Sequence, residues 1–313
     1  AKKTPRKRRS TNKKKSVKKT TSKDLKVGFI GGKGLGSKII QDNQKPRVDP
    51  YDPGNMIVFA TGPVTGTLVP ASSRFVVVTK SPLVNRHIDS CAGGHWGPEL
   101  KFAGYDAVVI TGKANEPSYA WIDDDKVQVN EAKHLWGRDT METEKALKEE
   151  LGDPSVRVVC IGPAGENLVR YACVNTELYR HAGRGGAGAV MGSKNLKAIA
   201  VRGTGGVDVA DIGKLEELSV EAADLCKKDH VTGNLRPNYG TTWGVLAANQ
   251  QGQLPVRNFS GTYYEDAEEI SGEKMRREGL IFKDRGCFSC TLRCGKVSLV
   301  RSGPYAGTLV EGP

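Results

Sequence analysis

Three cysteines near the end of the chain have the spacing of metal ligands. Cys287, Cys290 and Cys294 form a C-x2-C-x3-C motif, and short cysteine runs commonly supply three of the four thiolates of a [4Fe–4S] cluster. A zinc site is one alternative, but it normally needs a second Cys/His pair, and neither residue type follows Cys294. A second alternative is that the three cysteines are reduced structural thiols that bind no metal. The motif predicts a metal centre whose fourth ligand lies upstream or beyond Pro313.

Two segments rich in glycine and arginine have the composition of an anion site. Residues 90–100 contain closely spaced glycines, and residues 179–188 place Arg180 and Arg184 among four glycines. Glycines let backbone N–H groups approach an anion, and each guanidinium offers a fork that matches phosphate oxygens. These segments predict a phosphorylated or polyanionic ligand. A tight β-bulge or a helix-packing stretch is the structural alternative.

The glycines at 28–36 do not form a dinucleotide-binding fingerprint. The G-x-G-x-x-G pattern would need Gly or Ala where Ser37 and Ile39 stand. No acidic residue ends a βαβ unit about 20 residues further on. The segment instead predicts a turn, permitted by glycine, that opens a helix.

All the net charge of the chain lies in its first residues. The formal charge is +12, and residues 1–26 carry 13 Lys/Arg against one acid, Asp24. This low-complexity tail is predicted to be disordered alone. It is either an arm for nucleic acid or another polyanion, or a solvated tail or wrongly assigned start. The remaining 34 bases and 34 acids balance, so the body has no electrostatic footprint for nucleic acid.

Cysteine usage favours a reducing compartment. The seven cysteines are an odd number, and three of them are bunched, which indicates metal ligation and not a disulfide framework. No secretory signal is visible and no apolar run approaches the length that spans a membrane. We therefore expect a cytoplasmic protein.

The elements that must position these residues can be read from apolar patterns. Buried strands are predicted at 56–60, 74–80, 107–112 and 156–161, and a hairpin at 119–129. One helix is predicted at 140–151, and helices at 212–228, 243–250 and 271–278 dominate the second part. The residues expected on apolar helix sides are Met141, Ala146, Leu147, Leu151, Leu215, Leu218, Ala222 and Leu225.

This pattern predicts an α+β fold in two domains. Strands separated by few, short helices argue against a doubly wound sheet. We place a β-rich domain at 27–206 and the start of a helical domain, which carries the cysteine motif, at 207–313. The basic tail occupies 1–26.

Three longer motifs give the chain a family resemblance. They are ELKFAGYDA at 99–107, IGPAGEN at 161–167 and HAGRGGAGAVMGSKNLKAI at 181–199. In this order, and with the cysteine spacing, they strongly resemble the tungsten-dependent aldehyde:ferredoxin oxidoreductase family. The resemblance runs from about residue 29 to residue 313.

The resemblance implies a bis-pterin tungsten cofactor, held on the β-rich domain beside a [4Fe–4S] cluster. Family members oxidise an aldehyde with water to a carboxylic acid. Two electrons then pass through the cluster to ferredoxin or an electron-transfer subunit. By matching position, the pterin phosphates and the Mg²⁺ that bridges them would be contacted by Arg74, Cys91, Gly93, Arg180, His181, Gly183 and Arg184. The cluster ligands would be Cys287, Cys290 and Cys294.

The sequence departs from the family pattern at four places, one of which is its start, where the basic tail replaces the strand hairpin that the family normally has. Cys91 stands where the family usually has Asn, and His181 where it often has Ala. The family also continues beyond Pro313, where the fourth cluster cysteine and the acid/base groups are expected. We therefore assign no catalytic residue here, and we expect the isolated chain to lack aldehyde oxidation activity.

Two other functions stay open at this point. Residues 95–98 somewhat resemble the benzoyl-CoA reductase branch of the superfamily, which acts on an aryl-CoA. The second alternative is a non-catalytic protein whose basic tail binds a polyanion. The identity of the aldehyde, the choice between tungsten and molybdenum, and the formation of a homo-oligomer are not fixed by the sequence.

Overall fold

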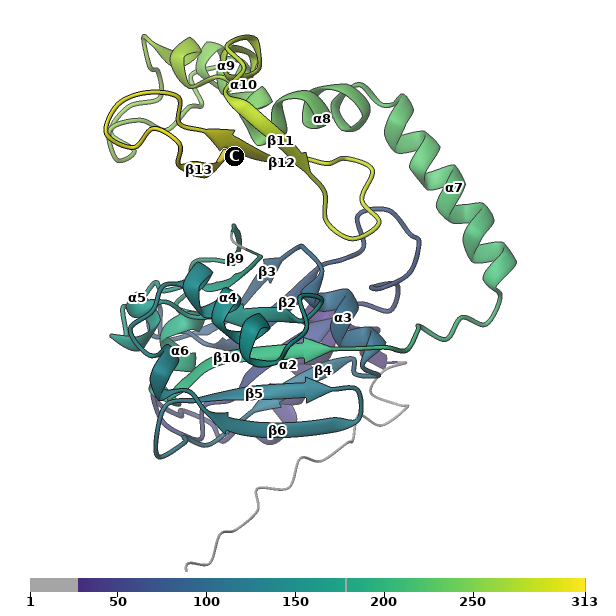
Figure 1. Ribbon diagram of the computed structural model, residues 1–313, viewed down its shortest axis with the longest axis vertical. Helices are drawn as coiled ribbons and strands as arrows, with labels where there is room; N and C mark the ends of the chain where they lie inside the picture. The colour runs from purple at the N-terminus through teal and green to yellow at the C-terminus, as the bar shows by residue number, and fades with distance from the viewer. Residues whose placement is uncertain (1–27, 178, 313) are drawn as a thin grey trace, which may run out of the picture.

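The computed structural model describes residues 28–177 and 179–312 (Figure 1). Among the described residues, helices make up 33% and strands 23%, which confirms the α+β prediction. The prediction for the basic tail at 1–26 lies outside the described residues. Within the described ranges, no helix combines the length and apolar character needed to cross a bilayer.

The first sheet has four antiparallel strands in the order β3-β2-β1-β4. The strands are β1 Ile57–Thr61, β2 Phe75–Lys80, β3 His87–Ala92 and β4 Ala107–Ile110. Helix α2, Gly32–Asn43, packs Leu35, Ile39 and Ile40 on one face of it. A Cβ on Gly36 would lie 2.7 Å from Val78, so a glycine permits this close approach. The predicted helix is confirmed, but it begins at Gly32, inside the glycine run.

The second sheet has six strands in the order β6-β5-β10-β7-β8-β9. They are β5 Ser118–Asp123, β6 Lys126–Glu131, β7 Arg157–Cys160, β8 Val174–Thr176, β9 Arg180–Ala182 and β10 Leu196–Arg202. Strand β10 runs parallel to β5, and the other pairs are antiparallel. Short segments η1 Lys133–Leu135, α5 Pro163–Glu166 and α6 Ala187–Ser193 connect these strands.

One continuous apolar core joins the two sheets. Helix α3, Trp96–Phe102, inserts Trp96 into it, and this indole is fully buried against Phe59 and Phe75, with ring centroids 5.7 Å and 4.8 Å away. The Trp96 Nε1–H donates to the Ile199 carbonyl at 3.1 Å. This anchor fixes residues 93–95, which precede α3, relative to both sheets.

Helix α4, Thr140–Glu150, covers the second sheet, and its predicted buried face is partly wrong. Leu147 is fully buried against that sheet, but the Met141 side chain is 53% exposed. Thr143 and Glu144 are buried in its place. A capping box at Asp139 and Glu142 fixes the helix start, and this start rotates Met141 toward solvent.

The second part of the chain begins with helix α7, Ile212–Lys228, as predicted (Figure 1). Its expected apolar stripe is only partly covered, since Leu218 and Leu225 are exposed and Ser219 is buried. Short helical segments follow at η2 Val231–Leu235, α8 Arg236–Tyr239, η3 Gly240–Trp243, α9 Gly244–Gln250, η4 Ala267–Ile270 and α10 Gly272–Arg277. The predicted helices at 243–250 and 271–278 are thereby confirmed.

A three-stranded antiparallel sheet, which the sequence did not predict, carries the cysteine motif. Its strands are β11 Ile281–Arg285, β12 Gly295–Leu299 and β13 Leu309–Gly312. The three cysteines lie on the loop that joins β11 to β12, and Figure 1 shows this loop reaching toward the first part of the chain. The proposed domain boundary near residue 206 falls between β10 and α7.

Candidate cofactor and metal site

The two glycine-rich segments meet where the two large sheets adjoin. Strand β3 is an edge of the first sheet and β9 an edge of the second. The Ser90 hydroxyl donates to the Gly183 carbonyl at 2.5 Å, and the Ser81 hydroxyl donates to the Gly185 carbonyl at 2.6 Å. Segments that are distant in sequence therefore form one surface, which we call the glycine-rich cradle (residues 90–95 and 180–186).

The cradle needs glycine at two of its positions. Arg184, Gly185 and Gly186 follow one another with φ values of 63°, 68° and 79°, a conformation that favours glycine. A Cβ on Gly186 would lie 2.0 Å from the Arg170 carbonyl oxygen. The glycines thus shape a tight turn, and this turn leaves the Arg184 side chain exposed.

The other residues expected to hold the cofactor surround this cradle. Arg74 is exposed just before β2, and Cys91 is exposed on β3. Gly93 is buried under the cysteine loop. The Arg180 guanidinium lies 4.9 Å from the centroid of the Tyr179 ring. Their assignment to a pterin remains a prediction.

His181 has a thiol as its neighbour. Its Nδ1 lies 3.7 Å from Cys173 Sγ across the β8–β9 hairpin. Partial burial lowers the pKa of His181 below its ordinary value and raises the pKa of Cys173. At neutral pH both groups are therefore uncharged, so the imidazole can offer a hydrogen bond to a ligand but not a positive charge.

The cysteine loop rests directly on the cradle. A Cβ on Gly93 would lie 2.7 Å from Cys287 Sγ. The Phe288 N–H donates to the Gly94 carbonyl at 3.2 Å. The Phe288 ring packs edge-on against His95 and Phe102, with centroids 6.3 Å and 5.7 Å away. A metal on this loop would therefore lie next to the cradle.

The three thiols share one half-buried loop, but their side chains do not converge on a single point. The Cys290 N–H donates to the Cys287 carbonyl at 3.1 Å. Burial raises the pKa of Cys290, the backbone N–H groups of Leu292 and Arg293 oppose this, and the neighbouring cysteines raise it further. Across residues 28–177 and 179–312, no three His, Cys, Asp or Glu side chains converge as a metal site.

These thiols nevertheless fit an iron–sulfur cluster chemically. Backbone N–H groups directed at the sulfurs are among the levers that set cluster potentials. A metal would displace the thiol protons on binding. The ligand set therefore stays a prediction, supported by the donor chemistry of the loop.

A buried carboxylate that sequence analysis missed supports the cradle. Glu177 accepts hydrogen bonds from the His95 backbone N–H and from His95 Nδ1, the latter at 3.0 Å. Burial raises its pKa, but the His95 contacts outweigh burial and lower it overall. Glu177 has a φ of 52°, and a Cβ on Gly94 would lie 2.9 Å from its carboxylate. The only signal for this residue in the sequence was the position of an acid shortly before Arg180.

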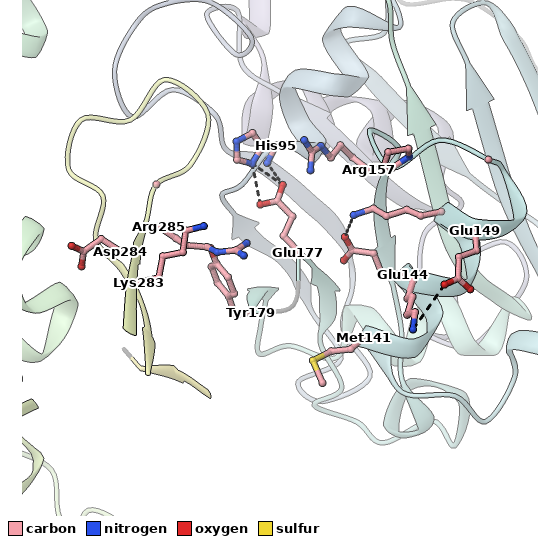
Figure 2. Close-up of a pocket in the computed structure, with 15 residues that line it drawn as sticks. His95, Met141, Glu144, Glu149, Arg157, Glu177, Tyr179, Lys283, Asp284 and Arg285 are labelled. Carbon is pink, nitrogen blue, oxygen red and sulfur yellow. Dashed lines mark hydrogen bonds and ion pairs between the residues drawn. The ribbon is translucent and has the colours of Figure 1, made fainter. Parts of the chain in front are cut away.

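An open cleft of about 820 Å³ borders both the cradle and the cysteine loop (Figure 2). Helix α4 forms one side, and the end of β11 with Gly286 forms the other. His95, Glu177 and Tyr179 lie between them. Many of the lining residues carry charge, and sequence analysis did not bring them together.

Comparisons with known proteins agree with the family resemblance. Residues 10–203 match the profile of the aldehyde ferredoxin oxidoreductase N-terminal domain, and residues 217–313 match domains 2 and 3. Tungsten-containing aldehyde ferredoxin oxidoreductases of Pyrococcus abyssi and Pyrococcus furiosus are 47% and 42% identical to the chain. These matches cover 94% and 93% of the chain but 48% and 47% of the relatives. The chain thus spans about half the length of these relatives.

A solved structure has the same fold. It is the active site complex BamBC of benzoyl coenzyme A reductase in complex with 1,5-dienoyl-CoA. The TM-score is 0.78 and the sequence identity 31%, over 93% of this chain and 46% of that one.

Proposed function

Because this chain belongs to the aldehyde ferredoxin oxidoreductase family, we propose that it carries the tungstopterin cradle and the iron–sulfur loop of an enzyme that oxidises an aldehyde to a carboxylic acid. One observation carries the proposal. The glycine-rich cradle contacts the cysteine loop at Gly93, against Cys287, and contacts the start of β12 at Gly295, against Arg180. Two redox groups held by these segments would therefore be neighbours.

The cradle residues would bind the phosphates of the pterins and the Mg²⁺ between them. Arginine supplies charge-assisted, forked hydrogen bonds to phosphate oxygens, and buried Gly93 lets the backbone come close. The residues assigned to this task are Arg74, Cys91, Gly93, Arg180, His181, Gly183 and Arg184. Neutral His181 would donate or accept one hydrogen bond, and Cys173 would orient its ring.

The loop residues Cys287, Cys290 and Cys294 would ligate a [4Fe–4S] cluster. When bound, the tungstopterin would supply the two-electron oxidation of the aldehyde and the cluster a path for those electrons. Water provides the added oxygen, so each turnover releases two electrons and two protons besides the acid. The electron acceptor that we propose is ferredoxin or an electron-transfer subunit.

Elemental analysis of the anaerobically purified protein tests the proposal. We expect tungsten together with about four iron atoms per chain, the stoichiometry of one [4Fe–4S] cluster. Single Cys→Ser substitutions at Cys287, Cys290 and Cys294 should remove the iron. Cys226→Ser, on α7 away from the loop, is the matched control. Zinc in place of iron, or iron that survives all three substitutions, would refute the cluster assignment.

The similarity to benzoyl-CoA reductase supports one second candidate, an enzyme that reduces the ring of an aryl-CoA. Aldehyde-dependent dye reduction and aryl-CoA ring reduction separate the two activities. The matches at 47% and 42% identity to aldehyde oxidoreductases favour the first.

A further inference from the structure

We propose that the cleft between α4 and β11 binds a small oxyanion, a carboxylate or a phosphate group, through Arg157 and Arg285. Arg157 begins β7 in the first part of the chain, and Arg285 ends β11 in the second. Both side chains line the cleft together with Glu177, and Arg285 lies against the Tyr179 ring (Figure 2). No residue of the glycine-rich cradle other than His95 lines this cleft, so the two sites are distinct.

The charges of the cleft do not balance internally. Each acid that lines it already has a partner. Glu144 pairs with Lys148 at 2.6 Å and Glu149 with Lys145 at 3.9 Å. Asp284 pairs with Lys296 at 2.7 Å, and Glu177 is held by His95. The lining cations that form no ion pair with any described residue are Arg157, Lys283 and Arg285.

The hydrogen bonding of the two arginines is also incomplete. The Nε–H groups of Arg157 and Arg285 are buried without a hydrogen-bond partner among the described residues. Buried polar groups in folded proteins nearly always find partners. An oxyanion in the open cleft would bind the outer N–H groups of the two guanidinium forks, and not the buried Nε–H groups, since it accepts several such bonds at once.

Glu177 does not exclude a second anion. Its carboxylate is only 9% exposed and already accepts the His95 bonds. Arg157 additionally lowers the pKa of Glu177 through space, but the two side chains form no ion pair. The guanidinium groups of Arg285 and Arg180 both lie near the Tyr179 ring, 5.7 Å and 4.9 Å from its centroid. Two positive guanidinium groups near the same ring repel each other, and an anion bound beside them would reduce this repulsion.

The dimensions of the cleft suit one end of an organic ligand. A volume of about 820 Å³ is in the range of small-molecule sites. Tyr179 and Met141 supply apolar surface on the same lining. Since Gly286 lines the cleft and immediately precedes Cys287, the anion would bind beside the cysteine loop.

Ligand-observed NMR on the full chain tests the site with two probes, inorganic phosphate by ³¹P and acetate labelled at its carboxylate carbon by ¹³C. We expect at least one probe to bind with a Kd on the order of 1 mM. Arg157→Gln and Arg285→Gln should each weaken that binding about tenfold, and the double variant should retain no more than the weak binding that the cradle arginines and residues 1–26 contribute. Lys283→Gln, at an exposed position, should weaken the binding about two- to threefold. This variant keeps the test decisive if an arginine variant fails to fold.

Two control variants separate this site from other anion sites. The controls are Lys126→Gln and Arg184→Gln. Lys126 is exposed at the end of the β5–β6 hairpin, and Arg184 belongs to the glycine-rich cradle. Both should retain the binding, and the basic residues 1–26 are common to every variant. The probe that binds more tightly identifies the ligand as a phosphate or as a carboxylate. Equal binding by wild type and the double variant, or loss only in Arg184→Gln, would overturn the proposal. The assay needs no metal, so its result is independent of the proposed function.

Discussion

Gly93→Ala should separate the cysteine loop from the cradle. The new Cβ would lie 2.7 Å from Cys287 Sγ, whereas non-bonded heavy atoms rest about 3.5–4.0 Å apart. The sulfur must therefore move by about 1 Å. The half-buried Cys287 side chain can rotate, so we expect a stability cost near the lower end of about 1–3 kcal/mol for overpacking.

The effect on metal binding should be larger than the effect on stability. A cluster ligand displaced by about 1 Å no longer matches the cluster geometry, and outer-sphere perturbations of metal sites typically cost about 10–100-fold in affinity. Iron per chain after anaerobic reconstitution and gel filtration measures this directly. We expect Gly93→Ala to retain less than about half the iron of wild type under limiting iron, by that affinity loss.

Two other glycines provide matched controls for Gly93→Ala. A Cβ on Gly183 or on Gly206 would meet no atom within 4 Å, and neither residue has a positive φ. Gly183→Ala and Gly206→Ala should therefore bind iron as wild type does. Wild-type iron content in Gly93→Ala, with the same melting temperature, would show that the loop does not depend on this contact.

Three further predictions concern the elements that support the site. Glu177→Gln should lower the free energy of unfolding by about 1.5–3 kcal/mol, because it replaces a charged acceptor of the His95 bonds. Since the folded pKa of Glu177 is depressed, wild type should lose this contribution as pH falls through that pKa, and urea unfolding of Glu177→Gln should lack this acid dependence. Asp139→Ala should cost about 1 kcal/mol because it removes the capping box of α4, measured by the urea midpoint. Leu147→Ala should cost about 2–5 kcal/mol, while exposed Met141→Ala should change stability by less than about 0.5 kcal/mol; similar losses in both would contradict the observed orientation of α4.

Apolar pattern predicted the strands that are buried on both faces. β1 and most of β2 are fully buried, and the run at 56–60 and that at 74–80 identified them. β8 and β9 have three residues each and include polar side chains. Their extended conformation depends on pairing with neighbouring strands, and the residue pattern of one sequence does not reveal that pairing. The β11–β13 sheet was missed for the same reason, since most of its residues are at least partly exposed.

The sequence predicted the composition of the site but not its arrangement. The glycine and arginine pattern identified both cradle segments, and spacing identified the cysteine loop. The contact of Gly93 with Cys287 depends on how the second part of the chain folds back, and no local pattern encodes that. Glu177 was missed because an isolated acid predicts a solvated side chain, whereas here it is buried beside His95.

The contact between cradle and loop also bears on electron transfer. Two glycines, Gly93 and Gly295, lie at this contact, and a Cβ at either would meet an atom of the opposite segment within 2.8 Å. Any larger residue would widen the gap between the cradle and the thiols. The Phe288 ring packs against His95 and Phe102, and this contact holds the loop against the same surface. Small residues at the contact and an aromatic wedge beside it together favour a short, fixed separation between two redox groups, which is the arrangement that the proposed function requires.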